Sequence, residues 1–164
     1  MNEIQIDFLA GTGIASWLIE QVGFPRGYSH VASVLADGRY LDARSDVLGD
    51  VPAGVHIREP STERWVRKRR VSLQVTAHEY GAWEDNLRAH LTVDYDKMAI
   101  LQWLEGRSLH TAGRWICSAL AINAVQHIRK VRYPLVVPAH EISPDSALLI
   151  LDTAGFDIGV EINA

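Results

Sequence analysis

The sequence contains one cysteine and no long hydrophobic run. A single thiol, that of Cys117, excludes an internal disulfide framework and a cysteine-rich metal site, and it suits a reducing compartment. No apolar stretch approaches the roughly 18 residues of a membrane-spanning helix. Residues 1–8 carry Asn, Glu, Gln and Asp where a signal peptide has basic residues. We therefore expect a cytoplasmic protein without an integral membrane segment.

The sequence also has fewer basic residues than acidic ones, 16 against 20. The net charge is −4, which gives no general reason to expect a nucleic-acid partner. Five of the seven residues from Arg64 to Arg70 are nevertheless basic. Because no alternation of aromatic and basic residues continues beyond Trp65, we interpret this cluster as a solvated edge strand or loop. The alternative is a patch that contacts an anionic ligand.

The histidines do not show the spacing of a metal site. Five of them stand at polar or helix-end positions, and none forms an H-E-x-x-H pattern: His78, His90, His110, His127 and His140. We therefore expect neither a metal nor another cofactor. His30 and His56 differ from the others because both lie on predicted strands.

The periodicity of the hydrophobic residues predicts a single α+β domain over residues 1–164, with a mostly antiparallel sheet. Gly11-Thr12-Gly13 lacks the third glycine and the lysine of a phosphate-binding loop, so we interpret it as a turn. The predicted strands are Glu3–Leu9, Ser29–Ala36, Arg39–Ala43, Gly54–Arg58, Arg70–Val75 and Phe156–Ile162. The predicted helices are Ile14–Val22, Ala77–Leu91, Asp94–Leu104, Ile116–Ile128 and Ala147–Ala154. The last has Ser143 as its N-cap and Pro144 at its first helical position.

Asp37-Gly38 is the strongest signal for a hairpin in the chain. With a tight turn centred there, positions whose numbers sum to about 75 face one another. In that register Asp42 lies opposite Ser33 and is only diagonal to His30. A bulge or a wider loop would bring the Asp42 carboxylate towards the His30 imidazole.

Cys117 stands in the first turn of the most apolar predicted helix. Thr111 and Gly113 are candidate N-caps, so we expect this helix to begin near Gly113. Its residues are apolar on almost every side, so we expect the helix to be covered on several sides and to lie at the centre of the domain. Unpaired amides and the positive end of the helix dipole favour a thiolate there.

Cys117, His30 and Asp42 together supply the parts of a thiol hydrolase. A thiolate attacks a carbonyl, an imidazole accepts and returns the proton, and a carboxylate orients the imidazole. His56 is an alternative base. Each residue by itself also has a structural interpretation, because a lone cysteine in an apolar helix is usually a small core residue.

Four short motifs in this order resemble a known family. They are Tyr28-Ser29-His30-Val31, Asp42-Ala43, Tyr95-Asp96 and Trp115-Ile116-Cys117-Ser118-Ala119-Leu120. Together they resemble the circularly permuted branch of the NlpC/P60 papain-like cysteine hydrolases. The likeness is to the YiiX/YebB-like group, with the lecithin:retinol acyltransferase-like enzymes as more distant relatives. It covers roughly Ile4 to Ile128, and the histidine precedes the cysteine, in the reverse of papain order.

The resemblance implies a permuted papain-like fold and a role for each matched residue. Cys117 would be the nucleophile, His30 the general base and acid, and Asp42 the orienting carboxylate, although a glutamate is commoner there in the family. Tyr95-Asp96 would cap and position the helix before Cys117. The backbone N–H of Cys117 would bind the oxyanion. Tyr28, Ser29 and Trp115 are the candidate substrate-binding residues.

The expected reaction is cleavage of an amide bond in a peptide or cell-wall fragment through an acyl-enzyme. An acyl-lipid hydrolase or acyltransferase of the same fold is an alternative, which the Arg64–Arg70 cluster would favour if it contacted an anionic surface. A further alternative, from another class of function, is a binding module without catalysis. The oligomeric state is left open by the sequence.

Overall fold

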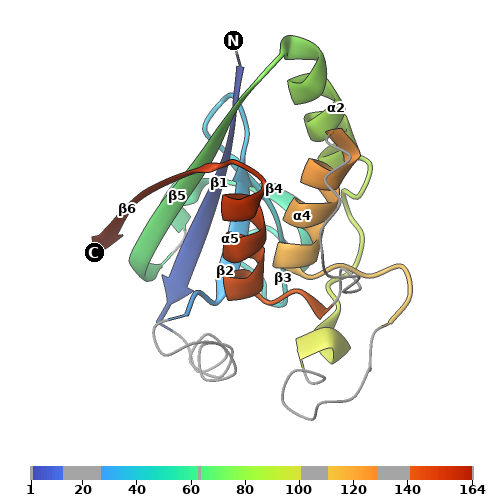
Figure 1. Ribbon diagram of the computed structural model, residues 1–164. Helices are drawn as coiled ribbons and strands as arrows, with labels where there is room; N and C mark the ends of the chain where they lie inside the picture. Colours follow the sequence, from blue (N-terminus) through green and yellow to red (C-terminus); the bar gives the residue numbers. More distant parts are fainter. Residues whose placement is uncertain (1, 13–26, 63, 101–110, 129–140, 164) are drawn as a thin grey trace.

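The structure is a computed structural model that describes residues 2–12, 27–62, 64–100, 111–128 and 141–163 (Figure 1). The helix predicted over Ile14–Val22 and the end of the one predicted over Asp94–Leu104 lie outside these ranges. Within them the chain is α+β, as predicted. The elements are β1 (Asn2–Gly11), β2 (His30–Val34), β3 (Tyr40–Arg44), β4 (Gly54–Arg58), the 3-10 helix η1 (Pro60–Thr62), β5 (Trp65–Val75), α2 (Ala77–Arg88), α4 (Cys117–Ile128), α5 (Pro144–Thr153) and β6 (Asp157–Asn163).

The six strands form one sheet in the order β4-β3-β2-β1-β5-β6. Every strand pairing in it is antiparallel, which confirms the predicted character of the sheet. β1 lies near the middle and pairs with β2 on one side and β5 on the other. Its alternating residues Ile4, Ile6 and Phe8 are fully buried, because that face of the strand looks into the core.

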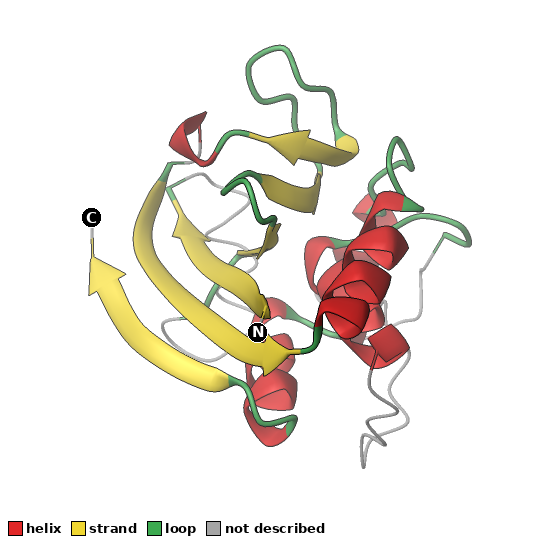
Figure 2. Cartoon of the chain, turned by 90° about the horizontal axis from the view of Figure 1, so that it is seen from above, coloured by secondary structure: helices red, strands yellow, loops and turns green. Residues whose placement is uncertain are grey.

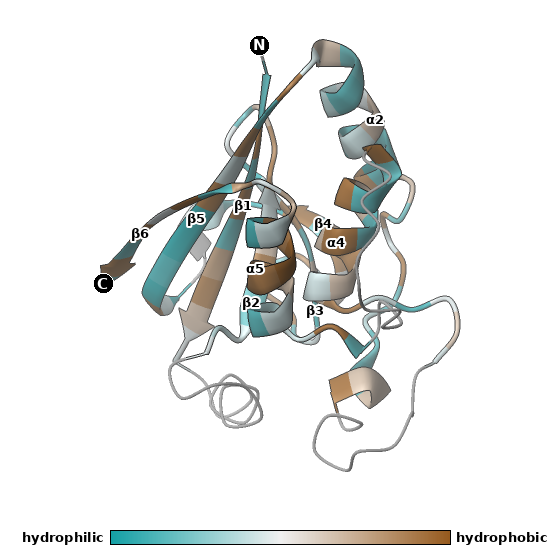
Figure 3. Ribbon diagram, in the orientation of Figure 1, coloured by the Kyte–Doolittle hydropathy of each residue, from teal (hydrophilic) through white to brown (hydrophobic). Residues whose placement is uncertain are grey.

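Helix α4 is the central helix, as its apolar sequence predicts. It packs against strands β2 and β3 and against helices α2 and α5. Figures 1 and 2 show α2 and α4 side by side on one side of the sheet. Hydrophobic residues occupy much of α4 and the middle of α5, whereas the start of β5 is hydrophilic (Figure 3). Within the described ranges, no helix combines the length and apolar character needed to cross a membrane.

The predicted helix starts are partly correct. Helix α2 begins at Ala77, where Thr76 and Glu79 form a reciprocal capping box. Ser143 caps α5 as predicted, its hydroxyl accepts from Ser146 N, and Pro144 is the first helical residue, as expected.

Helix α4 begins later than the expected start near Gly113. The segment before it is extended, because Trp115 N donates to Asp94 O at 3.2 Å and Asp96 N donates to Trp115 O at 3.0 Å. Gly113 has φ +78°, so it belongs to a turn and not to a cap. These tertiary hydrogen bonds make Cys117 the first helical residue.

The expectation of a solvated edge strand at Arg64–Arg70 is wrong. Strand β5 begins at Trp65 and lies between β1 and β6, so most of the cluster is in the sheet interior. The carboxylates of those two neighbouring strands face its cations. Lys68 and Arg70 bind Asp7 at 2.7 Å, whereas Arg67 and Arg69 lie 3.6 and 3.9 Å from Glu161.

Candidate active site

The β2–β3 hairpin brings His30 and Asp42 together through its register. Ser33 pairs with Leu41, so facing residues sum to 74 and not to the expected 75. Leu35 N donates to Arg39 O at 2.8 Å, which leaves a loop of three residues ending at Gly38, whose φ is +86°. A shift of one residue moves a side chain to the other face of the sheet. Asp42 therefore shares a face with His30.

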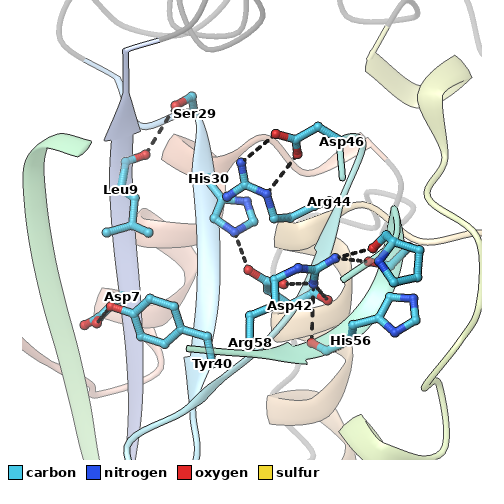
Figure 4. A network of polar contacts seen from close by, with 12 residues as sticks. Asp7, Leu9, Ser29, His30, Tyr40, Asp42, Arg44, Asp46, His56 and Arg58 are labelled. Atoms are coloured by element: carbon cyan, nitrogen blue, oxygen red, sulfur yellow. Dashed lines mark hydrogen bonds and ion pairs between the residues drawn. The ribbon is translucent and has the colours of Figure 1, made fainter. Parts of the chain in front are cut away.

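The two side chains are in direct contact. His30 Nε2 lies 2.7 Å from Asp42 Oδ2, and the Asp42 side chain is fully buried while that of His30 is 14% exposed. Figure 4 shows the imidazole pointing at the carboxylate across the two strands. The wider loop thus brings His30 and Asp42 into contact. A wider loop and a bulge were the two possibilities that the sequence left open.

Cys117 lies close to His30. It is almost fully buried at the first position of α4, and its charge and hydrogen bonding contribute to the raised pKa of His30. Leu120 N donates to Ile116 O, which begins the ladder of helical hydrogen bonds, so the amides of the first turn have no acceptor within the helix.

The charge state of His30 follows from its two partners. Burial by itself lowers the pKa of His30, but the negative charges of Cys117 and Asp42 and hydrogen bonds to both raise this pKa to about 10. The imidazole is therefore protonated at neutral pH. Contact with an imidazolium favours the thiolate form of a cysteine.

Arg58 completes the site, and sequence analysis missed it. This nearly fully buried residue of β4 donates from Nη1 to Asp42 Oδ1. The two Asp42 oxygens are thus divided between a histidine and an arginine (Figure 4). Alternation with the hydrophobic Val55 and Ile57 predicts that Arg58 points away from the core, and no sequence signal indicates that this position is buried.

Two further charged residues surround His30. Arg44, at the end of β3, donates from Nε and Nη2 to Asp46 at 2.9 and 3.0 Å (Figure 4). Burial raises the pKa of Asp46, but the hydrogen bonds and charge of Arg44 lower it below its usual value overall. Burial, together with the charge of Cys117, raises the pKa of Tyr95, so this tyrosine is neutral at physiological pH.

Tyr95-Asp96 has the capping role that was expected of it. The Asp96 carboxylate accepts from Met98 N and Ala99 N at 3.1 and 3.2 Å, at the start of the helical turn at residues 97–100. Its other oxygen accepts from Thr111 N at 3.0 Å. Asp96 is therefore tied to the segment that leads into Cys117.

The three predicted substrate-binding residues have internal contacts. The Tyr28 hydroxyl donates to Glu161 Oε2 at 2.5 Å, and the Ser29 hydroxyl accepts from Gly11 N at 2.9 Å. Trp115 is partly buried and packs against His90, with ring centroids 4.5 Å apart. Substrate binding by these residues stays a prediction.

His56 is not the partner of Cys117 in this arrangement. It lies on β4, directly across from Asp42 in the strand register, whereas His30 is bound to the Asp42 carboxylate and has a pKa that Cys117 raises. Within the described part of the chain, no group of three His, Cys, Asp or Glu residues is arranged to hold a metal ion.

Neither a protein-family model nor a curated protein matches this chain. The contacts among Cys117, His30, Asp42 and Arg58 are therefore the basis on which a function can be assigned.

Proposed function

We propose that the protein is a cysteine hydrolase that cleaves an amide bond of a peptide or cell-wall fragment through Cys117, His30 and Asp42. The observation that carries the proposal is the position of His30, whose Nε2 lies 2.7 Å from the buried Asp42 carboxylate and whose pKa is raised by the nearby Cys117. A nucleophile, a base within hydrogen-bonding reach and a group that orients the base are what acyl transfer requires.

The proposed reaction has two stages. The Cys117 thiolate attacks the carbonyl carbon and forms a C–S bond. The His30 imidazolium gives its proton to the departing amine as the C–N bond breaks, which leaves an acyl-enzyme and a neutral imidazole. Water then attacks the thioester and gives a proton to His30, and the C–S bond breaks. The carboxylic acid leaves, and the thiolate–imidazolium pair is restored.

The start of α4 supplies the stabilisation of charge that this reaction needs. The tetrahedral intermediates carry a negative oxygen close to the sulfur. Backbone N–H groups at a helix N-terminus point towards such an oxygen, and the helix dipole favours it. In this proposal the N–H of Cys117 is one oxyanion donor.

The arrangement of elements supports the proposed permuted papain-like fold. The strands that carry His30 and Asp42 precede the central helix that begins with Cys117. A central helix packed on an antiparallel sheet, with the cysteine at its start, is what the resemblance to the NlpC/P60 branch implies. The Arg64–Arg70 cluster gives no support to the acyl-lipid alternative, because four of its five cations face carboxylates of the sheet.

Alkylation of Cys117 by iodoacetamide across the pH range tests the proposal without knowledge of the substrate. Because the chain has one cysteine, the signal belongs to one site. An ordinary thiol reacts with a midpoint near about 8.5, whereas a thiolate paired with an imidazolium reacts well below that pH. We expect His30→Ala to remove the reactivity at acidic pH and Cys117→Ser to remove all alkylation.

Peptide substrates then test the reaction itself. We expect wild type, mixed with cell-wall peptides and quenched in acid, to carry the mass of an acyl group on Cys117. If Cys117 is alkylated only after the protein unfolds, it is a core residue and the hydrolase proposal is wrong. The binding-module alternative would then be favoured.

A further inference from the structure

Arg58 is the most heavily bonded side chain around the site. Its side chain is 1% exposed, and its guanidinium lies behind Asp42, on the side away from His30 (Figure 4). Besides the bond to Asp42 Oδ1, Nη2 donates to the carbonyls of Pro52 and Gly54 at 2.9 and 3.3 Å. Nη1 also lies 3.4 Å from the carbonyl oxygens of Asp42 and His56.

These contacts hold the guanidinium in one orientation. The carbonyls of Pro52 and Gly54 come from the chain that turns into β4, where Gly54 has φ +112°. A side chain at Gly54 would lie 2.7 Å from Val93 O, so the turn depends on glycine there. The backbone thus forms a cradle for one cation directly behind the carboxylate.

We propose that Arg58 is a positioning residue for the reaction, and that it acts by holding the Asp42 carboxylate in place and balancing the charges around His30. This inference rests on the proposed function. Across the proposed site the charged groups are, in order, a thiolate, an imidazolium, a carboxylate and a guanidinium. Their charges sum to zero. A buried site whose charges sum to zero carries no uncompensated charge.

Removing the guanidinium leaves this site with an excess negative charge. Burial opposes an uncompensated charge, so the site takes up one proton, on the carboxylate or on the sulfur. The other charged or titratable neighbours are Arg44 and Asp46 beside His30, His56 across from Asp42, and Tyr95 near Cys117. Arg44 is already paired with Asp46, so it does not replace the lost cation.

The test compares two arginine variants of the full chain. In Arg58→Gln we expect the midpoint of Cys117 alkylation to rise by at least about one pH unit, which lowers the alkylation rate at pH 6 by about tenfold. Arg70→Gln is the matched control, because Arg70 binds the other buried carboxylate, Asp7, with two hydrogen bonds. It removes a guanidinium from a buried carboxylate and leaves the charges around His30 unchanged, so its midpoint stays at the wild-type value.

Two more variants separate charge from packing. Arg58→Lys keeps the cation, so we expect it to recover at least half of the shift. The double variant Asp42→Asn with Arg58→Gln removes one charge of each sign, and its midpoint is expected within about half a pH unit of wild type. If Arg58→Gln alone does not fold, this double variant still tests the role of Arg58. A double variant with a midpoint more than one pH unit above wild type would overturn the inference.

Two further results would contradict the proposed role of Arg58 without affecting the proposed function. An Arg58→Gln midpoint equal to that of wild type, or an equal shift in Arg70→Gln, contradicts the role of Arg58. In both cases wild-type Cys117 still reacts at acidic pH, and the proposed hydrolase function stands. If wild-type Cys117 itself lacks reactivity below about pH 8, the proposed function fails before any variant is compared.

Discussion

Asp7 and Asp42 are two buried carboxylates with different surroundings. Both side chains are 0% exposed. Asp7 accepts from the Tyr40 hydroxyl at 2.6 Å and from Arg70 Nε and Nη2 at 2.7 and 2.8 Å, and it pairs with Lys68. Asp42 has one arginine and one histidine.

The difference lies in what the partners can do. Asp7 of β1 is held by Tyr40 of β3 and by Lys68 and Arg70 of β5, so this network fixes the three strands to one another. One partner of Asp42 is the His30 imidazole, whose pKa is raised by the nearby Cys117. Burial of a carboxylate therefore does not distinguish a structural group from a catalytic one, whereas a titratable partner in contact with a nucleophile does.

The largest expected contrast is in reactivity. Asp42→Asn should slow acylation of Cys117 by p-nitrophenyl acetate by at least about 100-fold, because the imidazolium loses the group that orients it. Asp7→Asn should remain within about twofold of wild type, since it does not contact the site. Stopped-flow release of p-nitrophenol measures both rates. Equal slowing in the two variants would show that the effect is loss of folding.

The next contrast is in stability. Asp7→Ala should lower the free energy of unfolding by about 3 kcal/mol, because Lys68 and Arg70 lose their common partner. Asp37→Ala removes an exposed carboxylate paired with Arg39 and should leave stability unchanged within error. Urea denaturation followed by tryptophan fluorescence compares the three proteins. A small effect of Asp7→Ala would mean that water replaces the carboxylate.

The contributions of His30 and Asp7 to stability should be lost at opposite ends of the pH scale. The pKa of His30 is raised from 6.5 to about 10, so its stabilising contribution is complete below pH 6.5 and is lost as pH rises to 10. Burial raises the pKa of Asp7, but hydrogen bonds from Arg70, Lys68 and Tyr40 lower it below 3.8 overall. Its contribution is complete above pH 3.8 and is lost as pH falls through the lowered value.

Denaturation at a series of pH values measures both contributions. The stability difference between wild type and His30→Gln should shrink from pH 6.5 to 10, and that between wild type and Asp7→Asn should shrink in acid. A His30 difference that grows with rising pH would contradict the raised pKa.

The smallest expected effect concerns Tyr40, which lies on β3 two residues before Asp42. Tyr40→Phe removes one of the donors to Asp7 and should lower the free energy of unfolding by about 1 kcal/mol. The midpoint of Cys117 alkylation should not change. A change in that midpoint would show that the two carboxylate networks are coupled along the strand.

Local features of the fold could be predicted well from the sequence. The start of α2 at Ala77 and the Ser143 cap depend on residues within one helical turn of each other. The strand β1 and the central helix α4 follow from hydrophobic periodicity. The segment before Cys117 was misjudged, because its hydrogen bonds go to Asp94 and Asp96 and not to the next turn.

The candidate site was likewise predictable from the sequence only in part. Cys117, His30 and Asp42 were identified as residue types at suitable places, but a tight turn at Asp37-Gly38 would have put Asp42 on the wrong face. One additional loop residue decides the pairing, and a sequence pattern does not resolve the turn that closely. Arg58 carried no signal at all, since alternation along β4 predicts an exposed side chain.

By itself, the sequence determined where helices and strands form and which residues can supply nucleophile, base and carboxylate, because periodicity, capping and chemical type are local properties. Only the tertiary structure decided that Asp42 and not Asp7 meets the histidine, that Arg58 balances the charge behind it, and that the basic strand β5 is paired inside the sheet. Those contacts join strands that are distant in sequence. Their energies depend on register and burial, which arise only when the whole sheet is assembled.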